Sequence, residues 1–132
     1  IVDLTESAEG SNVREDLQTA FSFNNWTRVN VQNATVDLAT SPGYYRINAV
    51  FNITSAAGAI EAFLIINDGT TDKYGFGVGI EAGVGNSSAV EHNGVYYLEA
   101  GDSLKGYSNN ANARILGQIR QIADVDGNLI NP

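Results

Sequence analysis

The apolar residues of this chain come in short runs that alternate with polar residues, and this pattern limits the fold more than any other feature. The clearest run spans 44–53, and Ser41-Pro42-Gly43 precedes it as a turn signal. Its alternate positions are apolar: Tyr45, Ile47, Ala49, Phe51 and Ile53. Alternation with a period of two is typical of a strand that buries one face. The residues therefore predict β-structure with one buried side per strand.

Turn residues recur about every 8–12 residues, which is typical of an all-β sandwich or jelly roll. Strand-like segments lie at 21–31, 36–39, 44–53, 59–66, 73–80, 90–99, 104–107 and 113–122. Asn67-Asp68-Gly69 is a strong hairpin signal, and Asn93-Gly94 predicts a break within 90–99. We therefore predict an all-β fold, a two-sheet antiparallel jelly-roll sandwich.

The length allows one domain with a flanking segment at each end. At 132 residues the chain can bury a single core. We expect three parts: an N-terminal arm over 1–20, a jelly-roll domain over 21–122 and a C-terminal tail over 123–132. Ser11 or Asn12 could cap a short helix in the arm, because apolar residues then recur with a helical spacing. These residues are Val13, Leu17 and Phe21.

The net charge of −8, with seven basic and fifteen acidic residues, argues against a nucleic-acid partner, because binding phosphates needs clustered Lys and Arg. The basic residues are scattered along the sequence, and only Arg114 and Arg120 share a predicted strand. No apolar run approaches about 18 residues, the length of a spanning helix. No basic-then-apolar leader opens the sequence. We expect a soluble protein with no nucleic-acid and no membrane partner.

Few residues could carry catalysis. His92 is the only histidine and lies in Glu91-His92-Asn93-Gly94, which predicts an exposed turn. Cysteine is absent, so thiol catalysis is excluded. The glutamates on or beside predicted strands show no spacing that selects a pair: Glu61, Glu81, Glu91 and Glu99. We therefore expect no enzyme activity and no cofactor.

The tail raises one question about a metal. Asp124-Val125-Asp126-Gly127-Asn128 resembles the opening of a calcium-binding loop, since alternate oxygens can converge on one ion. The full loop needs a glutamate further on, which the next residues do not offer. A terminal turn is the favoured interpretation, and we predict no metal site.

Glycine is concentrated in one predicted strand, Lys73–Ile80. Gly75, Gly77 and Gly79 lie on one face of it, and large residues lie on the other. Glycine weakens a strand interior unless another group approaches the backbone closely. Two interpretations stay open: a bent edge strand or bulge, and a flat face that packs against a neighbouring chain.

Three segments resemble the complement-type and tumour-necrosis-factor-like jelly rolls. Gly43–Ile47 is similar to the opening of a central strand in that family, and Tyr97–Leu104 to its leucine and glycine-aspartate segment. Ile115–Ile119 resembles the closing strand, which carries a glycine among large apolar residues. Gly101-Asp102 is expected to form a tight turn whose carboxylate accepts backbone N–H groups. Gly117 is expected where a neighbouring ring would clash with a side chain.

The chain also departs from that family. Ile115 and Leu116 replace the aromatic residue expected beside the closing glycine, and segments at both ends lie outside the match. We expect neither a collagen-like stalk nor a membrane stem before the domain. Jelly rolls without Cys and Met that are rich in Asn and Gly look more like virion proteins, such as phage head-decoration proteins or fibre tips.

The predicted strand 59–66 is apolar on both faces, so one face needs a cover that a single two-sheet domain does not supply. Phe63 and Ile65 share one of these faces. The family resemblance implies a threefold neighbour as the cover, with Tyr107 as the matching aromatic residue. The alternative cover is the N-terminal arm. We predict a homotrimer with Phe63, Ile65 and Tyr107 at its interface.

These observations predict a structural virion protein: a trimeric head-decoration, or cement, protein on the capsid surface, partnered by the major capsid protein or another virion protein. Either the N-terminal arm or the C-terminal tail would dock on the shell, and four apolar residues would form the docking arm: Val2, Leu4, Val13 and Leu17. The alternative is a phage fibre tip or lectin-like head that binds a cell-surface glycan. Its contacts would be Asn86–Ser88, His92, Asn93, Asn109–Asn112 and Trp26. A secreted cytokine-like ligand is a third interpretation.

Overall fold

The computed structural model describes residues 26–54, 58–81 and 87–130. Within these ranges the chain forms eight strands and no helix, and so none that could cross a membrane. The strands are β1 (Thr27–Gln32), β2 (Thr35–Ala39), β3 (Gly43–Ile53), β4 (Ile60–Asn67), β5 (Asp72–Ile80), β6 (Ser88–Leu98), β7 (Ser103–Ser108) and β8 (Ala113–Ala123). Each coincides with a segment predicted from the sequence. The short helix predicted in the arm lies outside the described residues.

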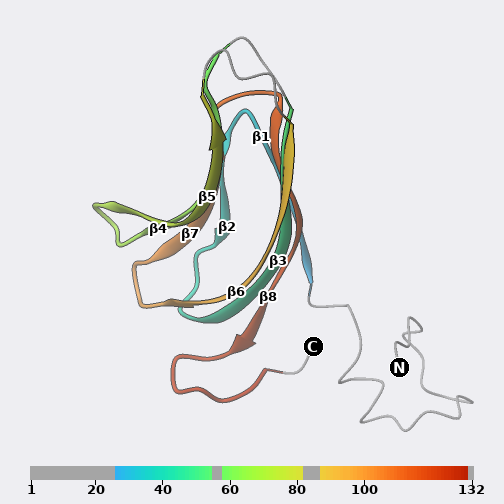
Figure 1. The fold of residues 1–132 in the computed structure, drawn as a ribbon. Coiled ribbons are helices and arrows are strands. Elements are labelled where there is room, and N and C mark those ends of the chain that lie inside the picture. Colours follow the sequence, from blue (N-terminus) through green and yellow to red (C-terminus); the bar gives the residue numbers. More distant parts are fainter. Residues whose placement is uncertain (1–25, 55–57, 82–86, 131–132) are drawn as a thin grey trace, which may run out of the picture.

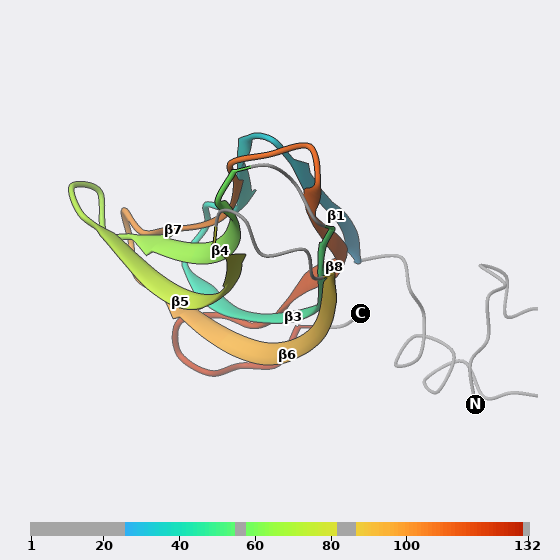
Figure 2. The same cartoon turned by 45° about the horizontal axis from the view of Figure 1, so that its top comes forward.

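The strands form two antiparallel four-stranded sheets that face each other (Figure 1, Figure 2). One sheet has the order β1-β8-β3-β6, and the other has the order β2-β7-β4-β5. The pairing is nested, since the first strand lies beside the last, the second beside the seventh, the third beside the sixth and the fourth beside the fifth. The predicted two-sheet antiparallel sandwich is confirmed.

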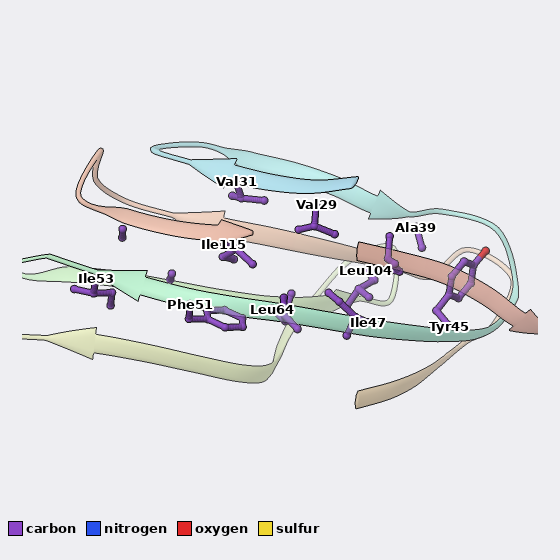
Figure 3. Packing of buried hydrophobic residues seen from close by; sticks show 14 of the residues in the cluster. Val29, Val31, Ala39, Tyr45, Ile47, Phe51, Ile53, Leu64, Leu104 and Ile115 are labelled. Carbon is purple, nitrogen blue, oxygen red and sulfur yellow. The ribbon is translucent and has the colours of Figure 1, made fainter. Parts of the chain in front are cut away.

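The hydrophobic core lies between the two sheets, where alternate residues of each strand point inwards (Figure 3). From the central strand β3 the apolar set predicted by alternation is buried: Tyr45, Ile47, Ala49, Phe51 and Ile53. The opposite sheet contributes Ile60, Ala62, Leu64 and Leu104. The burial of apolar surface is the main interaction that holds such sheets together, and it contributes about 25 cal/mol for each Å² removed from water.

Two predicted turns are confirmed. Between β6 and β7, Gly101 has a φ of 92°, and Asp102 Oδ2 accepts a hydrogen bond from the Glu99 backbone N–H at 2.9 Å. Between β4 and β5, the Asp68 carboxylate accepts backbone N–H groups of Thr71 and Thr70. These bonds hold the pKa of Asp68 well below its usual range. The β4–β5 turn projects beyond the rest of its sheet (Figure 1).

The break predicted within the sixth strand is wrong. β6 is paired with β3 along its whole length, Ser88–Leu98. Asn93 pairs with Asn48 and Gly94 with Ile47, in the middle of this ladder. Pairing with a long central strand therefore overrides the local turn signal of Asn-Gly.

Gly117 is required for a reason other than the predicted one. A Cβ atom at this position would overlap the backbone of Asn48 and Ala49 in β3, not an aromatic ring. Gly117 of β8 pairs directly with Ala49, so the two backbones approach closely at this point. The glycine thus allows the central strands to pack against each other.

Candidate interaction surfaces

The outer face of the sheet β2-β7-β4-β5 carries a cluster of aromatic residues. Ala62 and Leu64 point into the core, so Phe63 between them points outwards. The Phe63 ring stacks on Tyr107 of β7 with centroids 6.2 Å apart and meets Tyr74 of β5 edge-on at 5.1 Å. We define the aromatic face as Phe63, Ile65, Tyr74 and Tyr107.

The aromatic face contains the three residues that the sequence predicted for an interface. Phe63 lies directly opposite Tyr107 in the strand register, which brings residues far apart in the sequence together. Ile65 is only 5% exposed, so it is already covered within a single chain. Tyr74 is 68% exposed and is the residue of this face that a partner would cover most.

Sequence reasoning missed Tyr74 because it placed all large residues of the glycine-rich strand on one face. The register shifts between Leu64 and Ile65, where Leu64 pairs with Phe76 and Ile65 with Tyr74. Gly75 is the extra residue, and this bulge turns Tyr74 to the face opposite Phe76. A bulge changes the alternation by one residue, so periodicity alone does not reveal it.

The glycines of β5 fit the edge-strand interpretation. β5 is the last strand of its sheet, and it carries the bulge at Gly75. A Cβ atom at Gly77 would overlap the Phe63 ring. Gly77 therefore provides the space in which the aromatic face is assembled.

The outer face of the other sheet is basic. Residues that flank buried core positions of β1, β3 and β8 point outwards, and four of them are arginines. We define the arginine face by these residues: Arg28, Arg46, Arg114 and Arg120. Among the described strand residues on this face, Glu91 of β6 is the only carboxylate. The sequence showed these arginines as scattered because only the strand pairing gathers them.

His92 is not in an exposed turn, so this prediction is wrong. It lies in β6 on the inner side of its sheet, and its ring stacks on Phe76 of β5 at a centroid distance of 4.3 Å. His92 Nε2 lies 2.8 Å from the Tyr96 hydroxyl. Burial lowers the pKa of His92. The residue joins the two sheets where their edge strands meet, and it is no loop contact for a glycan.

The asparagine-rich connection between β7 and β8 uses its amides internally. Asn109 Oδ1 accepts a hydrogen bond from the Glu61 backbone N–H at 2.9 Å, and Asn109 Nδ2 donates to the Ala59 carbonyl at 3.1 Å. Asn110 Oδ1 accepts the backbone N–H of Asn112. These bonds tie the connection to β4 and leave few amides for a sugar. Asn86, another predicted glycan contact, lies outside the described residues.

The acidic tail forms the turn that the sequence favoured. The Asp124 carboxylate accepts hydrogen bonds from both the side-chain amide and the backbone N–H of Asn128 and from the Asp126 backbone N–H. These bonds lower the pKa of Asp124. Within the described ranges, no three His, Cys, Asp or Glu side chains gather as metal ligands would. The predicted docking arm, with Val2 and Leu4, lies outside those ranges.

Comparison with known proteins points to phage capsids. No protein-family model matches the chain, and no curated protein matches it. A crystal structure of a pentameric capsid protein isolated from metagenomic phage sequences is 42% identical, with a TM-score of 0.73 over 100% of this chain and 82% of that chain. A second crystal structure of such a protein, solved by iodide phasing, has the same identity and TM-score over 84% of its chain.

These matches support the predicted placement in a phage virion, whereas the resemblance to complement-type and tumour-necrosis-factor-like proteins finds no support in them. An identity of 42% over the whole chain is well above what a shared fold alone produces. The chain therefore belongs to a family of phage capsid proteins, with a structural role in the virion.

Proposed function

We propose that this protein is a homopentameric capsid protein that decorates the phage shell at positions of fivefold symmetry. The observation that carries the proposal is the 42% identity, over the whole chain, to a pentameric capsid protein. Five copies related by rotation close into a ring, which matches a fivefold site on a shell. A pentamer replaces the trimer that the sequence predicted. The role involves no catalysis and no cofactor.

The nested strand order supports the classification of the fold as a jelly roll. In such folds eight strands form two sheets through Greek-key connections. One long hairpin wound into two sheets produces the pairing seen here: β1 with β8, β2 with β7, β3 with β6 and β4 with β5. The first and last described strands, β1 and β8, are therefore neighbours in one sheet.

We assign the contact between subunits to the aromatic face. Tyr74 is 68% exposed beside the half-buried rings of Phe63 and Tyr107, and large aromatic residues contribute most to the stability of interfaces. A ring has heterologous contacts, so this face of one subunit would meet a different surface of the next subunit. The edge strand β5 borders the patch and would be covered in the same contact.

Light scattering after size exclusion tests the pentamer directly. Five copies of the 14.0 kDa chain have a mass of about 70 kDa, and three copies have about 42 kDa. We expect the larger value at micromolar concentration. A trimer or a monomer at that concentration would overturn the proposal.

A matched pair of variants tests the assigned contact. Tyr74→Ser removes the most exposed ring of the aromatic face, and Val95→Ser removes a side chain that is 58% exposed on the opposite sheet. We expect Tyr74→Ser to shift the mass towards that of a single chain, since a central aromatic contact is worth about 2 kcal/mol or more. Val95→Ser should leave the pentamer intact. Equal behaviour of the two variants would contradict the assignment.

A further inference from the structure

The arginine face concentrates positive charge on a protein whose net charge is −8. Arg46 of β3 and Arg120 of β8 are direct partners in the strand register, so two like charges lie opposite each other. Such a pair is destabilising unless an anion lies beside it. Among the described residues none of the four arginines forms an ion pair with a carboxylate. Within the described ranges, the four arginines of this face therefore outnumber its single strand carboxylate, Glu91.

The guanidinium groups are also incompletely bonded. The Nε atoms of Arg114 and Arg120 are shielded from solvent and have no hydrogen-bond acceptor within the part of the chain that the structure describes. Arg114 Nη2 donates to Gln32 Oε1 at 3.0 Å, and the Arg120 guanidinium lies 5.3 Å from the centre of the Trp26 ring. An arginine has five N–H donors, and carboxylates satisfy them best. The remaining donors on this face favour a ligand with carboxylates.

Two open grooves cross this face. The first is lined by Arg46, Asn93, Gly94, Val95, Arg120 and Ile122. The second is lined by Trp26, Thr27, Arg28, Gly117 and Gln118. Each groove contains at least one arginine together with apolar or amide groups. A surface that binds an extended peptide would combine the same kinds of group.

The chain itself carries a segment of matching charge. Residues 1–25 contain five acidic residues and one basic residue, Arg14, so their net charge is −4. The acidic residues are Asp3, Glu6, Glu9, Glu15 and Asp16. The segment joins the described part of the chain at Trp26, which lies under the Arg120 guanidinium. Twenty-five extended residues reach about 80 Å, whereas four strands span about 15–20 Å, so length does not limit the contact.

We propose that residues 1–25 lie across the arginine face of their own chain, where their carboxylates pair with its arginines. The contact neutralises the opposed charges of Arg46 and Arg120 and covers the two grooves. It places the segment on its own sandwich, in contrast to the docking on the shell that the sequence predicted. The inference does not depend on the number of subunits, so a failed pentamer test leaves it standing.

Cleavage by trypsin after Arg14 provides the test, because Arg14 is the only Lys or Arg in residues 1–25. The cleavage rate in the full chain is divided by the rate in a synthetic peptide of residues 1–25 under the same conditions. We expect strong protection at about 0.01 M salt and its loss at about 1 M salt, where the screening length falls from about 30 to 3 Å. A ratio near one at low salt would overturn the proposal.

Two pairs of substitutions make the test specific. Arg46→Gln with Arg120→Gln should increase cleavage roughly three- to tenfold, the effect of losing two exposed ion pairs. Lys73→Gln with Lys105→Gln removes the same charge from the opposite sheet and should have no effect. Arg46→Gln alone should give a smaller increase; because Arg46 is exposed, this variant keeps the test valid if the double variant fails to fold. Equal rates for the arginine and lysine variants would overturn the proposal.

The double substitution Glu15→Gln with Asp16→Asn tests the contribution of the carboxylates of residues 1–25. Its cleavage rate after Arg14 is divided by the rate in a synthetic peptide of residues 1–25 with the same two substitutions. These substitutions should weaken the protection of Arg14 from trypsin in the parent chain. In a chain that already carries Arg46→Gln and Arg120→Gln they should cause little further loss of protection, because the ion pairs are already broken there. Protection that disappears on dilution would assign the segment to a neighbouring copy and overturn the intrachain contact. Binding of an oligonucleotide to the face with no protection of Arg14 would also overturn it.

Discussion

At the scale of single residues, Ser108 ties together two connections at one end of the sandwich. Its side chain is 2% exposed, and Oγ donates to the Ala113 carbonyl at 2.7 Å and accepts the Asn33 backbone N–H at 3.1 Å. We expect Ser108→Ala to lower the free energy of unfolding by about 1–3 kcal/mol, since it leaves buried polar groups unpaired.

Urea titration measures this loss for Ser108→Ala. The control is Ser88→Ala at the exposed start of β6, which should change the free energy of unfolding by less than about 0.5 kcal/mol. Equal losses in the two variants would show that the hydrogen bonds of Ser108 do not stabilise the fold.

His92 should make the stability depend on pH. Burial against Phe76 lowers its pKa below the ordinary value of 6.5, so the unfolded chain takes up a proton more readily than the folded chain. The free energy of unfolding is then highest above this value and falls as the pH drops through 6.5 towards the lower pKa of the folded form. Thermal unfolding between about pH 7.5 and 5.5 measures this slope.

A His92→Gln variant provides the comparison for this pH dependence. Glutamine keeps a group that can bond the Tyr96 hydroxyl but does not titrate, so the slope in that range should disappear. An unchanged slope in the variant would assign the pH dependence to other groups.

At the scale of elements, the edge strand β5 depends on glycine at one position more than at another. A Cβ atom at Gly77 would overlap the Phe63 ring, whereas at Gly79 it would meet the Ile60 carbonyl oxygen at 3.4 Å, an ordinary contact. We expect Gly77→Ala to destabilise the protein by about 1–3 kcal/mol, the usual cost of overpacking. Gly79→Ala should change stability by less than about 1 kcal/mol.

The two glycine variants are compared by chemical denaturation and by near-ultraviolet circular dichroism, which reports the packing of the aromatic residues. A change in the aromatic signal for Gly77→Ala alone would confirm that Gly77 positions Phe63. Similar stability and spectra for both variants would contradict the role of Gly77.

The strands themselves were predictable, because they depend on local patterns. β3 follows from alternation over Tyr45, Ile47 and Phe51, and the turn before β7 from Gly101-Asp102. The failures arose where a distant partner overrides a local signal. Pairing with β3 carries β6 through Asn93-Gly94 without a turn.

At the scale of the whole molecule, a pentamer couples folding to protein concentration. If five chains stabilise each other, the melting temperature rises as the concentration rises, because association draws on the folded form only. We expect this rise in the parent chain and a smaller rise in Tyr74→Ser. Scanning calorimetry over a hundredfold concentration range measures both. A melting temperature independent of concentration would contradict the assembly.

The candidate surfaces were only partly predictable. Phe63, Ile65 and Tyr107 were predicted together and do share one face, but Tyr74 was hidden by the bulge at Gly75. The arginine face was not predicted at all. Its residues come from three strands, and no local pattern reveals that β1 and β8 are neighbours.

The amino-acid sequence alone was enough to predict the class of fold, the eight strands and the turns at Asp68 and Gly101, since these follow from the order of apolar, polar and glycine residues within short windows. The pairing of the strands, the inward position of His92 and the shared surface of the four arginines became evident only from the folded chain. The physical reason is that β-sheet hydrogen bonds join residues far apart in the chain, and the short-range pattern of a strand does not encode its partner.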